Sequence, residues 1–526
     1  MRGSWCFLIL ILNFLALFCN GYRILGVFPF NGKSHFVMFE RLMKGLAVRG
    51  HRVDVVGHFP LKKPFPNYND IVSLDGTLPN LVNNVTLDFV EKIRNVYSPA
   101  TTISTVFGTE LCHLMDHPRF KNLIQNPPGD PPYDLAVVEI FGANCYLALG
   151  HHFGVPVVGI VTGLMFPWIN KLVGNPDNTA YVPNSFSSFT GSMNFWERVE
   201  NTASHFAMNW KFDRGASRQD DLIKKYIGPD ALSVEEARKN ISLVLVGSHY
   251  TLNGPKPLAS SVIEVGGLHI EENESTLPDD LKNWLDGSDE GFVYVSFGSM
   301  VKIESFSEET IAALYASLRK LSPIRALVKI AEPEQLLPGL PSNVMTSPWI
   351  PQVAVLKHKN IRAFVTHGGL MGTQEAVYAG VPMIGIPLFG DQDQNVRLYV
   401  KLKLAVNLNL YEITEENLDA AFDAVLRDPT YKKSAKIMSK KFRDRPTSAL
   451  ETAIFWIEHV VRDGGSALKS PAIHLTWWQI SLLDVYAFFI LLIAVIGSIT
   501  LAAVLKLKKL FRHQGIKIAL TRKKVT

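Results

Sequence analysis

The stretch from Trp349 to Asn395 constrains the fold more than any other part of the chain. It reads WIPQVAVLKHKNIRAFVTHGGLMGTQEAVYAGVPMIGIPLFGDQDQN. The apolar run 361–366 predicts a buried strand, and the residues from Met371 to Tyr378 predict a helix that Gly380 ends. Residues 383–388 predict a second strand. This order of elements indicates an α/β fold with a parallel sheet.

His367, Gly368 and Gly369 follow the first of these strands directly. They are therefore predicted to lie where the carboxyl end of a strand meets the amino terminus of a helix. Ligands of open α/β sheets bind at this edge, and free helix N–H groups attract phosphate there. Glycine lets the backbone approach an anion closely. The sequence thus predicts a phosphate site.

Other side chains of the same stretch suit the remaining parts of a nucleotide sugar. Trp349 offers a flat face for a base, and Gln352 offers both a donor and an acceptor. Glu375 lies two helical turns beyond the glycines, where its carboxylate could reach a ribose diol. Asp391 and Gln392, after the second strand, could hold sugar hydroxyls. Together they predict a nucleotide-sugar site.

These residues resemble the donor-site signature of the UDP-glycosyltransferases. The shared patterns are Trp-x-Pro-Gln, His-Gly-Gly, Gly-x-x-Glu-Ala, Gly-Val-Pro and Asp-Gln-x-x-Asn. The resemblance covers essentially the whole chain and points to the membrane-anchored animal branch, particularly the insect type. It implies the GT-B fold, in which two Rossmann-like, doubly wound domains face each other across a cleft. The alternative interpretation is that these strands and glycines are only the core of a generic Rossmann-like domain. The donor-binding residues that the resemblance implies are Ser299, Trp349, Gln352, His367, Gly368, Gly369, Gly372, Thr373, Glu375, Asp391 and Gln392.

The N-terminal half opens with a similar alternation. A strand is predicted over residues 22–28 and a helix from about Phe36 to Val48, which places His35 at their junction. A later strand, 135–138, places Glu139 on the same edge. The resemblance implies that His35 is the general base. Many relatives carry an aspartate at the position of Glu139, and that aspartate would orient the histidine. Because glutamate is longer, the pairing of His35 with Glu139 is in question.

The chain of 526 residues is expected to divide into six parts. The N-terminal domain would bind the acceptor, and the C-terminal domain the UDP-sugar. The parts are a signal peptide (1–21), an N-terminal Rossmann-like domain (22–254), a C-terminal Rossmann-like domain (255–465), a juxtamembrane segment (466–484), a transmembrane helix (485–505) and a basic cytoplasmic tail (506–526).

Charge and flanking residues predict a single-pass type I membrane protein. Of the net charge of +5, the last 21 residues contribute eight basic side chains and no acid, which leaves −3 for the remainder. Basic residues mark the cytoplasmic flank, so the domains would be luminal. The terminal Lys523-Lys524-Val525-Thr526 resembles a dilysine retrieval signal of the endoplasmic reticulum. Nothing in the body predicts a nucleic-acid surface.

The cysteines leave two interpretations open. Cys6 and Cys19 would leave with the signal peptide, so Cys112 and Cys145 could form a disulfide or remain as buried thiols. Cys112, His113, Asp116 and His117 have spacing that could bind zinc, but a distant ligand is lacking, so we predict no metal there. Glycosylation sequons occur at Asn84, Asn240 and Asn273.

Residues 163–240 are interpreted as the variable acceptor region. Within it, Phe195 to Phe212 predicts an aromatic-rich helix. Core packing is the expectation for its large side chains, and a membrane-facing surface is the alternative.

The predicted activity is inverting transfer of a hexose, most simply glucose, from a UDP-sugar to a hydroxyl of a small lipophilic acceptor. The UDP-sugar is a co-substrate and no cofactor is expected. Asp391-Gln392-Asp393 spells a DxD triplet, yet helix-dipole binding of phosphate makes a cation redundant. Membrane-bound relatives suggest self-association. The alternatives are a UDP-glucuronate donor or a noncatalytic UDP-sugar or lipophile-binding protein. An oxidoreductase or hydrolase would need a G-x-G-x-x-G motif or a nucleophile elbow, which we do not find.

Overall fold

The computed structural model describes residues 21–96, 98–271 and 277–522. The expected signal peptide and the sequon at Asn273 lie outside these ranges, apart from Gly21. The chain divides into two compact units, one reaching to Ser470 and one beginning at Pro471.

The N-terminal half of the first unit is built on a seven-stranded parallel sheet with the order β3-β2-β1-β4-β5-β6-β7. The neighbouring strands β4, β5 and β6 are buried along their whole length. Their sequences are continuous apolar runs, as expected for parallel strands with helices on both faces of the sheet. The strands are β1 (Arg23–Phe28), β2 (Arg52–Gly57), β3 (Tyr68–Ser73), β4 (Leu135–Glu139), β5 (Val157–Val161), β6 (Ile241–Val246) and β7 (Val262–Glu264).

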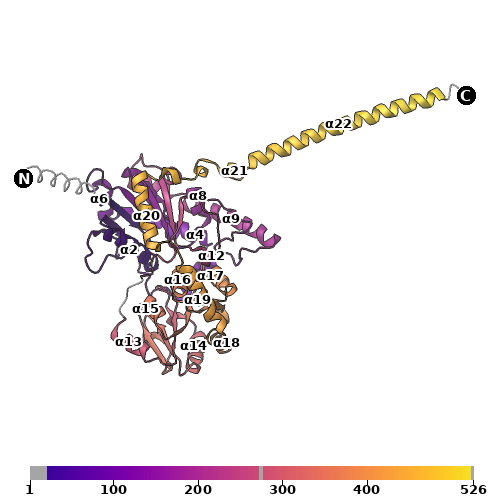
Figure 1. The fold of residues 1–526 in the computed structure, drawn as a ribbon. Helices are drawn as coiled ribbons and strands as arrows, with labels where there is room; N and C mark the ends of the chain where they lie inside the picture. Colours follow the sequence, from indigo (N-terminus) through magenta and orange to yellow (C-terminus); the bar gives the residue numbers. More distant parts are fainter. Residues whose placement is uncertain (1–20, 97, 272–276, 523–526) are drawn as a thin grey trace, which may run out of the picture. The chain divides into compact units, whose positions relative to one another are not determined.

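Helices connect these strands and cover the sheet (Figure 1). The long connection between β5 and β6 carries α9, which is interpreted as part of the acceptor region. The helices are α2 (Lys33–Val48), α3 (Leu87–Val96), α4 (Pro99–Ser104), α5 (Glu110–Cys112), α6 (Pro118–Gln125), α7 (Ala148–His152), α8 (Pro167–Val173), α9 (Phe195–Ala216), α10 (Gln219–Tyr226), α11 (Val234–Ala237) and α12 (Tyr250–Asn253).

The C-terminal half is built on a second parallel sheet of six strands, with the order β10-β9-β8-β11-β12-β13. The strands are β8 (Phe292–Ser296), β9 (Arg325–Lys329), β10 (Val344–Ser347), β11 (Ile361–Thr366), β12 (Met383–Gly385) and β13 (Ala405–Asn407). The helices are α13 (Asp279–Asp286), α14 (Glu308–Lys320), α15 (Gln352–Lys357), α16 (Leu370–Ala379), α17 (Gln392–Lys401), α18 (Glu415–Arg427) and α19 (Pro429–Arg443).

The expected domain boundaries at residues 254 and 465 differ from what the structure shows. Strand β7 pairs with β6 and closes the first sheet, although it follows residue 254. Helix α20 (Ala449–Asp463) lies beside α2 (Figure 1), and Ile457 and Val460 share a hydrophobic core with Leu42. Burial of these apolar side chains is the physical reason that the chain returns to its N-terminal half.

One glutamine joins the two halves of the first unit. Gln374 on α16 is 1% exposed. Its Nε2 donates to the carbonyl of Gly247 at 2.6 Å, and its Oε1 accepts the N–H of Gly267 at 2.9 Å. Because a buried amide is costly unless it is bonded, this pair of bonds fixes α16 against the end of β6.

The structure resolves the two interpretations of the cysteines in favour of a disulfide, between Cys112 and Cys145. Cys112 is therefore not available as a zinc ligand. The neighbouring His113 instead contacts the hydroxyl of Tyr226, at 2.9 Å from Nδ1.

Core packing is the wrong expectation for most of the large side chains of α9. Only Phe212 is buried, at 3% exposure, whereas Trp196 is 75% exposed and Trp210 is 60% exposed. The inner face of the helix packs Phe212, Met208 and Ala216 against the core and also carries Asn201, which is fully buried. The exposed aromatic residues lie on the outer face.

The second unit contains α21 (Trp477–Ile480) and α22 (Leu483–Arg522). The part of α22 from Leu483 to Arg512 is long enough to cross a membrane, and its most apolar stretch of 18 residues has a mean hydropathy of 2.8. The expected span, 485–505, lies within it, and the helix continues into the basic tail. A single apolar C-terminal helix is thus present, as expected for a membrane anchor.

Candidate active site

His35 lies in the first turn of α2, at the carboxyl edge of the first sheet. The helix begins at Lys33, three residues before the expected Phe36, and its N-cap is Gly32. The apolar residues that mark the helix in the sequence start only at Phe36, so the polar first turn carries no periodic signal. The structure therefore places His35 on a helix, where its backbone is fixed.

Glu139 ends β4 and holds the imidazole of His35. The Nδ1 of His35 lies 2.7 Å from Oε1 of Glu139, whose side chain is 2% exposed. The other carboxylate oxygen accepts the N–H of Phe30 at 3.4 Å. A carboxylate only accepts hydrogen bonds, so Nδ1 carries the proton and Nε2 keeps its lone pair. This arrangement can abstract a proton at Nε2.

A cavity of about 800 Å³ opens beside His35. Aromatic and aliphatic side chains form much of its wall, and both halves of the unit add polar side chains to it. The wall includes Phe30, Leu81, Val85, Phe107, Phe141, Phe166, Phe186, Ser188, Asp391, Gln392 and Arg397. Such a cavity suits a small apolar molecule with one reactive polar group.

The rings around His35 form a connected cluster. The His35 ring centroid lies 4.6 Å from that of Phe30 and 5.1 Å from that of Phe141. Phe166 continues the cluster from Phe141, at 6.1 Å, to Phe186, at 5.3 Å. These rings are close enough to stack on a flat ligand while they keep its polar group near the imidazole.

The glycine-rich turn after β11 leads into the amino terminus of α16, where free N–H groups can bind an anion. Gly368 has a φ of +84° and Gly369 is the N-cap of the helix. The first three N–H groups of the helix, from Leu370 to Gly372, have no partner inside it by helix geometry. A Cβ on Gly369 would lie 2.6 Å from Nε2 of His367. The turn thus needs glycine to leave room for the histidine.

Ser299 follows β8 and His367 follows β11, and the two turns are adjacent, since a Cβ on Gly298 would lie 2.9 Å from Cε1 of His367. Among the described residues, Oγ of Ser299 and Nδ1 of His367 are buried and have no hydrogen-bond partner. Buried polar atoms are normally satisfied, so both of these atoms are free to bond a polar group of a ligand. Burial, with the nearby charge of Lys329, lowers the pKa of His367 to about 4. The imidazole is therefore neutral and can donate one hydrogen bond.

Lys329 is a residue of this region that the sequence analysis missed. It ends β9, is 6% exposed, and donates from Nζ to Oδ1 of Asn83. Burial lowers its pKa to about 8. Its position at the carboxyl end of an apolar strand could have indicated Lys329 as a site residue, because ligands bind at that edge of the sheet.

Glu375 and Gln352 lie together on α16 and α15. Nε2 of Gln352 donates to Oε2 of Glu375 at 2.7 Å, and the hydroxyl of Tyr294 donates to Oε1 of Gln352 at 3.1 Å. His269 lies 3.3 Å from the other oxygen of Glu375. These contacts fix the orientation of the carboxylate. Trp349 is 52% exposed, so a face of its ring is open.

The structure differs from the expectation at Thr373. Its side chain is fully buried, and Oγ1 lies 2.9 Å from the hydroxyl of Tyr399 and 3.0 Å from the carbonyl of Gly369. Its N–H already donates to Gly369. Helix periodicity turns this position toward the core, so Thr373 packs α16 and has no group left for a ligand. Gly372, one residue earlier, keeps its free N–H.

Asp391 and Gln392 lie on the cavity wall with His35. Burial raises the pKa of Asp391, against the effect of a hydrogen bond from Asn395 at 3.0 Å. Oε1 of Gln392 accepts the N–H groups of Leu388 and Phe389, at 2.8 and 3.0 Å. The loop before α17 therefore fixes the glutamine side chain.

The DxD triplet does not present two free carboxylates. Asp391 accepts from Asn395, and Asp393 accepts from Nε of Arg397 at 2.8 Å. In the part of the chain that the structure describes, no three His, Cys, Asp or Glu side chains form a group that could hold a metal ion.

Comparison with known proteins shows the family of this chain. Residues 86–517 match the family described as UDP-glucoronosyl and UDP-glucosyl transferase. The chain belongs to this family. It is thus a UDP-glycosyltransferase, an inverting enzyme that uses a UDP-sugar. UDP-glucosyltransferase 2 of Dactylopius coccus is 35% identical over 478 residues, which is 90% of each chain.

The names of other relatives of this UDP-glycosyltransferase refer to the transfer of other sugars. UDP-glucuronosyltransferase of Pleuronectes platessa is 31% identical over 72% of this chain and 81% of its own. The 2-hydroxyacylsphingosine 1-beta-galactosyltransferase of Rattus norvegicus is 32% identical over 90% of this chain and 86% of its own.

Solved structures confirm the GT-B fold. Glycosyltransferase VinC in complex with dTDP superposes with a TM-score of 0.55 at 16% identity, over 84% of this chain and 99% of its own. Glycyrrhiza uralensis UGT73P12, solved with glycyrrhetinic acid 3-O-monoglucuronide, gives 0.53 at 17% identity, over 90% and 99%. At such identities the likeness concerns the fold alone.

Proposed function

We propose that this enzyme transfers glucose from UDP-glucose to a hydroxyl of a small lipophilic acceptor. The observation that carries the proposal is that His35, bonded to Glu139, lines the same cavity as Asp391 and Gln392. A base for the acceptor and polar groups for a sugar thus meet in one apolar space. The glucosyltransferase name of a relative at 35% identity supports glucose as the sugar.

The proposed reaction is a single displacement. Nε2 of His35 takes the proton of the acceptor hydroxyl while its oxygen attacks the anomeric carbon of the sugar. The bond from that carbon to the UDP oxygen breaks, and its electron pair leaves with UDP. Glu139 accepts the hydrogen bond of Nδ1 and stabilises the imidazolium as it forms. Attack opposite the leaving group inverts the anomeric configuration.

The leaving UDP gains negative charge, which the turn after β11 is suited to stabilise. The free N–H groups of α16 with the positive end of its dipole, Oγ of Ser299 and the neutral imidazole of His367 supply hydrogen bonds. The buried ammonium of Lys329 supplies a positive charge nearby. These fixed groups need little rearrangement as the bond breaks.

The remaining donor contacts follow from the positions of the side chains. Trp349 stacks on the uracil, and Gln352 bonds its edge. Glu375 accepts hydrogen bonds from the ribose hydroxyls, and Asp391 and Gln392 hold the glucose. Asp391 is suited to this role because its carboxylate lines the cavity beside its donor Asn395, and the hydroxyls of a sugar could supply further hydrogen bonds.

The donor is tested by product formation in microsomes that contain the full chain. UDP-glucose and UDP-glucuronate are each offered with a panel of phenols, flavonoids and steroids, and products are measured by mass spectrometry. We expect glucosides from UDP-glucose and at least tenfold less product from UDP-glucuronate. Glucuronides as the main product would overturn the assignment of the sugar. UDP binding without any product would indicate a noncatalytic binding protein.

The proposed location is the membrane of the endoplasmic reticulum, with residues 22–480 in the lumen. The apolar helix from Leu483 to Arg512 and the terminal dilysine support it. Asn84 is exposed and Asn240 is half-buried, so both sequons are accessible in a luminal domain. A mass decrease on treatment with endoglycosidase H, absent in an Asn84→Gln, Asn240→Gln, Asn273→Gln variant, would support this topology. Resistance of a glycosylated chain to the enzyme would place it beyond this compartment.

A further inference from the structure

The segment between α8 and α9 is held in place by a buried asparagine on α9. Asn201 is fully buried, and its Oδ1 accepts the N–H of Asn184 at 2.8 Å. Its Nδ2 donates to the carbonyls of Thr179 and Val182, at 2.8 and 2.9 Å. Both N–H groups and the oxygen of this amide are therefore bonded to the backbone of one loop.

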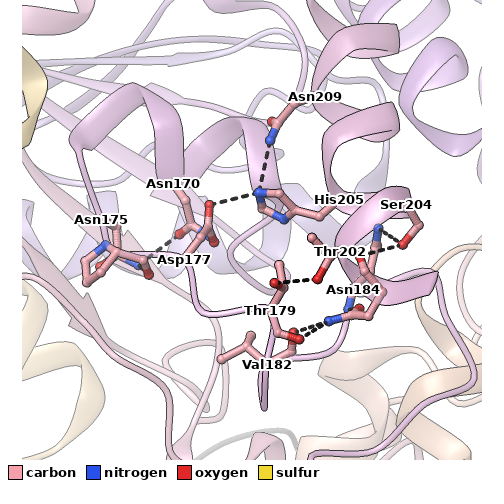
Figure 2. A network of polar contacts seen from close by, with 12 residues as sticks. Asn170, Asn175, Asp177, Thr179, Val182, Asn184, Thr202, Ser204, His205 and Asn209 are labelled. Atoms are coloured by element: carbon pink, nitrogen blue, oxygen red, sulfur yellow. Dashed lines mark hydrogen bonds and ion pairs between the residues drawn. The ribbon is translucent and has the colours of Figure 1, made fainter. Parts of the chain in front are cut away.

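Three further contacts fasten the same loop to α8 and α9. The hydroxyls of Thr179 and Thr202 lie 2.8 Å apart. His205 on α9 lies 3.3 Å from Asp177, which in turn accepts a hydrogen bond from Asn170 (Figure 2). Polar bonds to α8 and α9 thus hold the loop 177–184, which has no helix or strand of its own.

The residues that directly follow this loop form part of the cavity wall. Phe186 and Ser188 line the cavity. Oδ1 of Asn184 accepts the N–H of Phe186 at 3.1 Å, and the ring of Phe186 stacks on Phe166 at 5.3 Å. The position of Asn184 therefore determines where Phe186 stands in the cavity.

The donor half of the enzyme contacts the loop at this same residue. Nε2 of Gln394 on α17 donates to the carbonyl of Asn184 at 3.1 Å. Gln394 lies two positions after Gln392, and Asp391 is the N-cap of its helix. The loop that carries Phe186 is thus bonded to the helix whose beginning lines the sugar end of the cavity.

We propose that Asn201 and Gln394 are positioning residues that hold the acceptor wall in register with the sugar-binding end of α17. Neither belongs to the cavity wall in the part of the chain that the structure describes, so both act through Asn184. The proposal rests on the proposed function, in which this cavity receives the acceptor. Displacement of the wall by a fraction of an ångström would move the acceptor hydroxyl relative to His35 and the sugar.

Gln394→Ala is the first variant, because the fold tolerates it. The carbonyl of Asn184 also accepts the N–H and the hydroxyl of Ser187, at 2.9 and 2.8 Å, so it stays satisfied. We expect kcat/KM for a phenol acceptor to fall about threefold to tenfold, the effect of one hydrogen bond. The KM for UDP-glucose and the melting temperature should stay within error of the wild type.

Gln394→Glu separates positioning from space filling. The glutamate keeps the size of the side chain but places an acceptor against the carbonyl of Asn184. We expect a loss at least as large as that of Gln394→Ala. A matched control is Lys401→Ala, an exposed position at the other end of α17, which should leave every parameter unchanged.

Asn201→Asp tests the hydrogen bonds between α9 and the loop 177–184. It keeps the acceptor for the N–H of Asn184 and removes the two donors to Thr179 and Val182. We expect a loss of more than tenfold in kcat/KM for the acceptor. Because both variants act on the same loop, the double variant with Gln394→Ala should lose less than the product of the single losses.

Full-length enzyme in microsomes is assayed at saturating UDP-glucose with varied phenol, then at fixed phenol with varied donor. The coupling would be overturned if the loss in the double variant equalled the product of the two single losses. Wild-type kinetics of Gln394→Glu would also overturn it, as would a rise in the KM for UDP-glucose as large as the rise in the KM for the phenol. Phe186→Ala distinguishes the failure of the proposed function. If it leaves the acceptor KM unchanged, this cavity is not the acceptor site; if it raises the KM while the Gln394 and Asn201 variants do not, only the coupling is wrong.

Discussion

Nδ1 of His35 lies 2.7 Å from Oε1 of Glu139, although glutamate stands where many relatives are expected to carry an aspartate. The imidazole is met at the carboxyl end of β4 by a carboxylate that is 2% exposed and is also bonded by the N–H of Phe30. The additional methylene is thus accommodated without loss of the hydrogen bond. Two predictions concern this pair, two concern the binding of UDP, and one concerns the fold.

Replacement of His35 by alanine should abolish most of the turnover. Loss of the general base is expected to lower kcat by a factor of about 10² to 10⁴. UDP binding, measured by titration calorimetry on purified enzyme, should remain, because His35 lies on the acceptor half. A His35→Ala enzyme with wild-type kcat would exclude this residue as the base.

Glu139→Asp and Glu139→Gln should both slow the reaction, for different reasons. Aspartate is shorter by about a bond length and would lose the 2.7 Å contact, with an expected loss of about tenfold in kcat. Glutamine keeps the length but removes the negative charge that stabilises the imidazolium, so its loss should be larger, on the order of 10². The order of the two variants is the test. A Glu139→Asp enzyme faster than the wild type would show that the glutamate is poorly placed.

UDP affinity should fall as the pH rises through about 8. Burial lowers the pKa of Lys329 to about 8, so the ammonium is charged below that pH and neutral above it. A positive charge near the diphosphate favours binding, and the benefit is therefore present at low pH and lost at high pH. Calorimetric titration of UDP between pH 6.5 and 9.5 would show the dependence. Lys329→Met should bind weakly at every pH in this range and show a flatter profile.

Transfer should survive removal of divalent cations. The carboxylates of Asp391 and Asp393 are bonded by Asn395 and Arg397, and the proposed phosphate contacts are hydrogen bonds and a lysine. We expect initial rates within twofold of the untreated enzyme after dialysis against excess EDTA. Loss of activity that Mn²⁺ restores would assign the DxD triplet to a metal.

Acidification should destabilise the fold through His249. Burial, with the charge of Arg445 nearby, lowers the pKa of this histidine from 6.5 to about 4. The unfolded chain binds the proton first, so the contribution of the neutral imidazole is complete above pH 6.5 and is lost as the pH falls toward 4. One pKa unit corresponds to about 1.4 kcal/mol, so the loss approaches ~3 kcal/mol.

The measurement is the melting temperature at pH 7.5 and pH 5. His249→Gln removes the titrating group, so its melting temperature should fall less between these two pH values than that of the wild type. An equal fall in both proteins would show that His249 does not contribute.

The strand and helix that carry the expected donor residues could be predicted from the sequence because the signals are local. The apolar run of β11, the glycines after it and the stop at Gly380 each act within a few residues of themselves. The same holds for α22, whose length and apolar composition suffice to indicate a membrane anchor. For such elements, backbone geometry and side-chain periodicity determine the outcome before any tertiary contact forms.

Only the tertiary structure decided which distant elements meet. The strand β7 has three residues and joins the first sheet because β6 offers its edge there, and α20 returns to the N-terminal half because its apolar face is buried there. Thr373 belongs to a donor-site motif yet turns into the core, while Lys329, outside the motif, is buried near His367. The bond from Gln394 to Asn184 joins residues 210 positions apart. Burial and hydrogen bonding between distant segments depend on the packed whole, so no local pattern contains them.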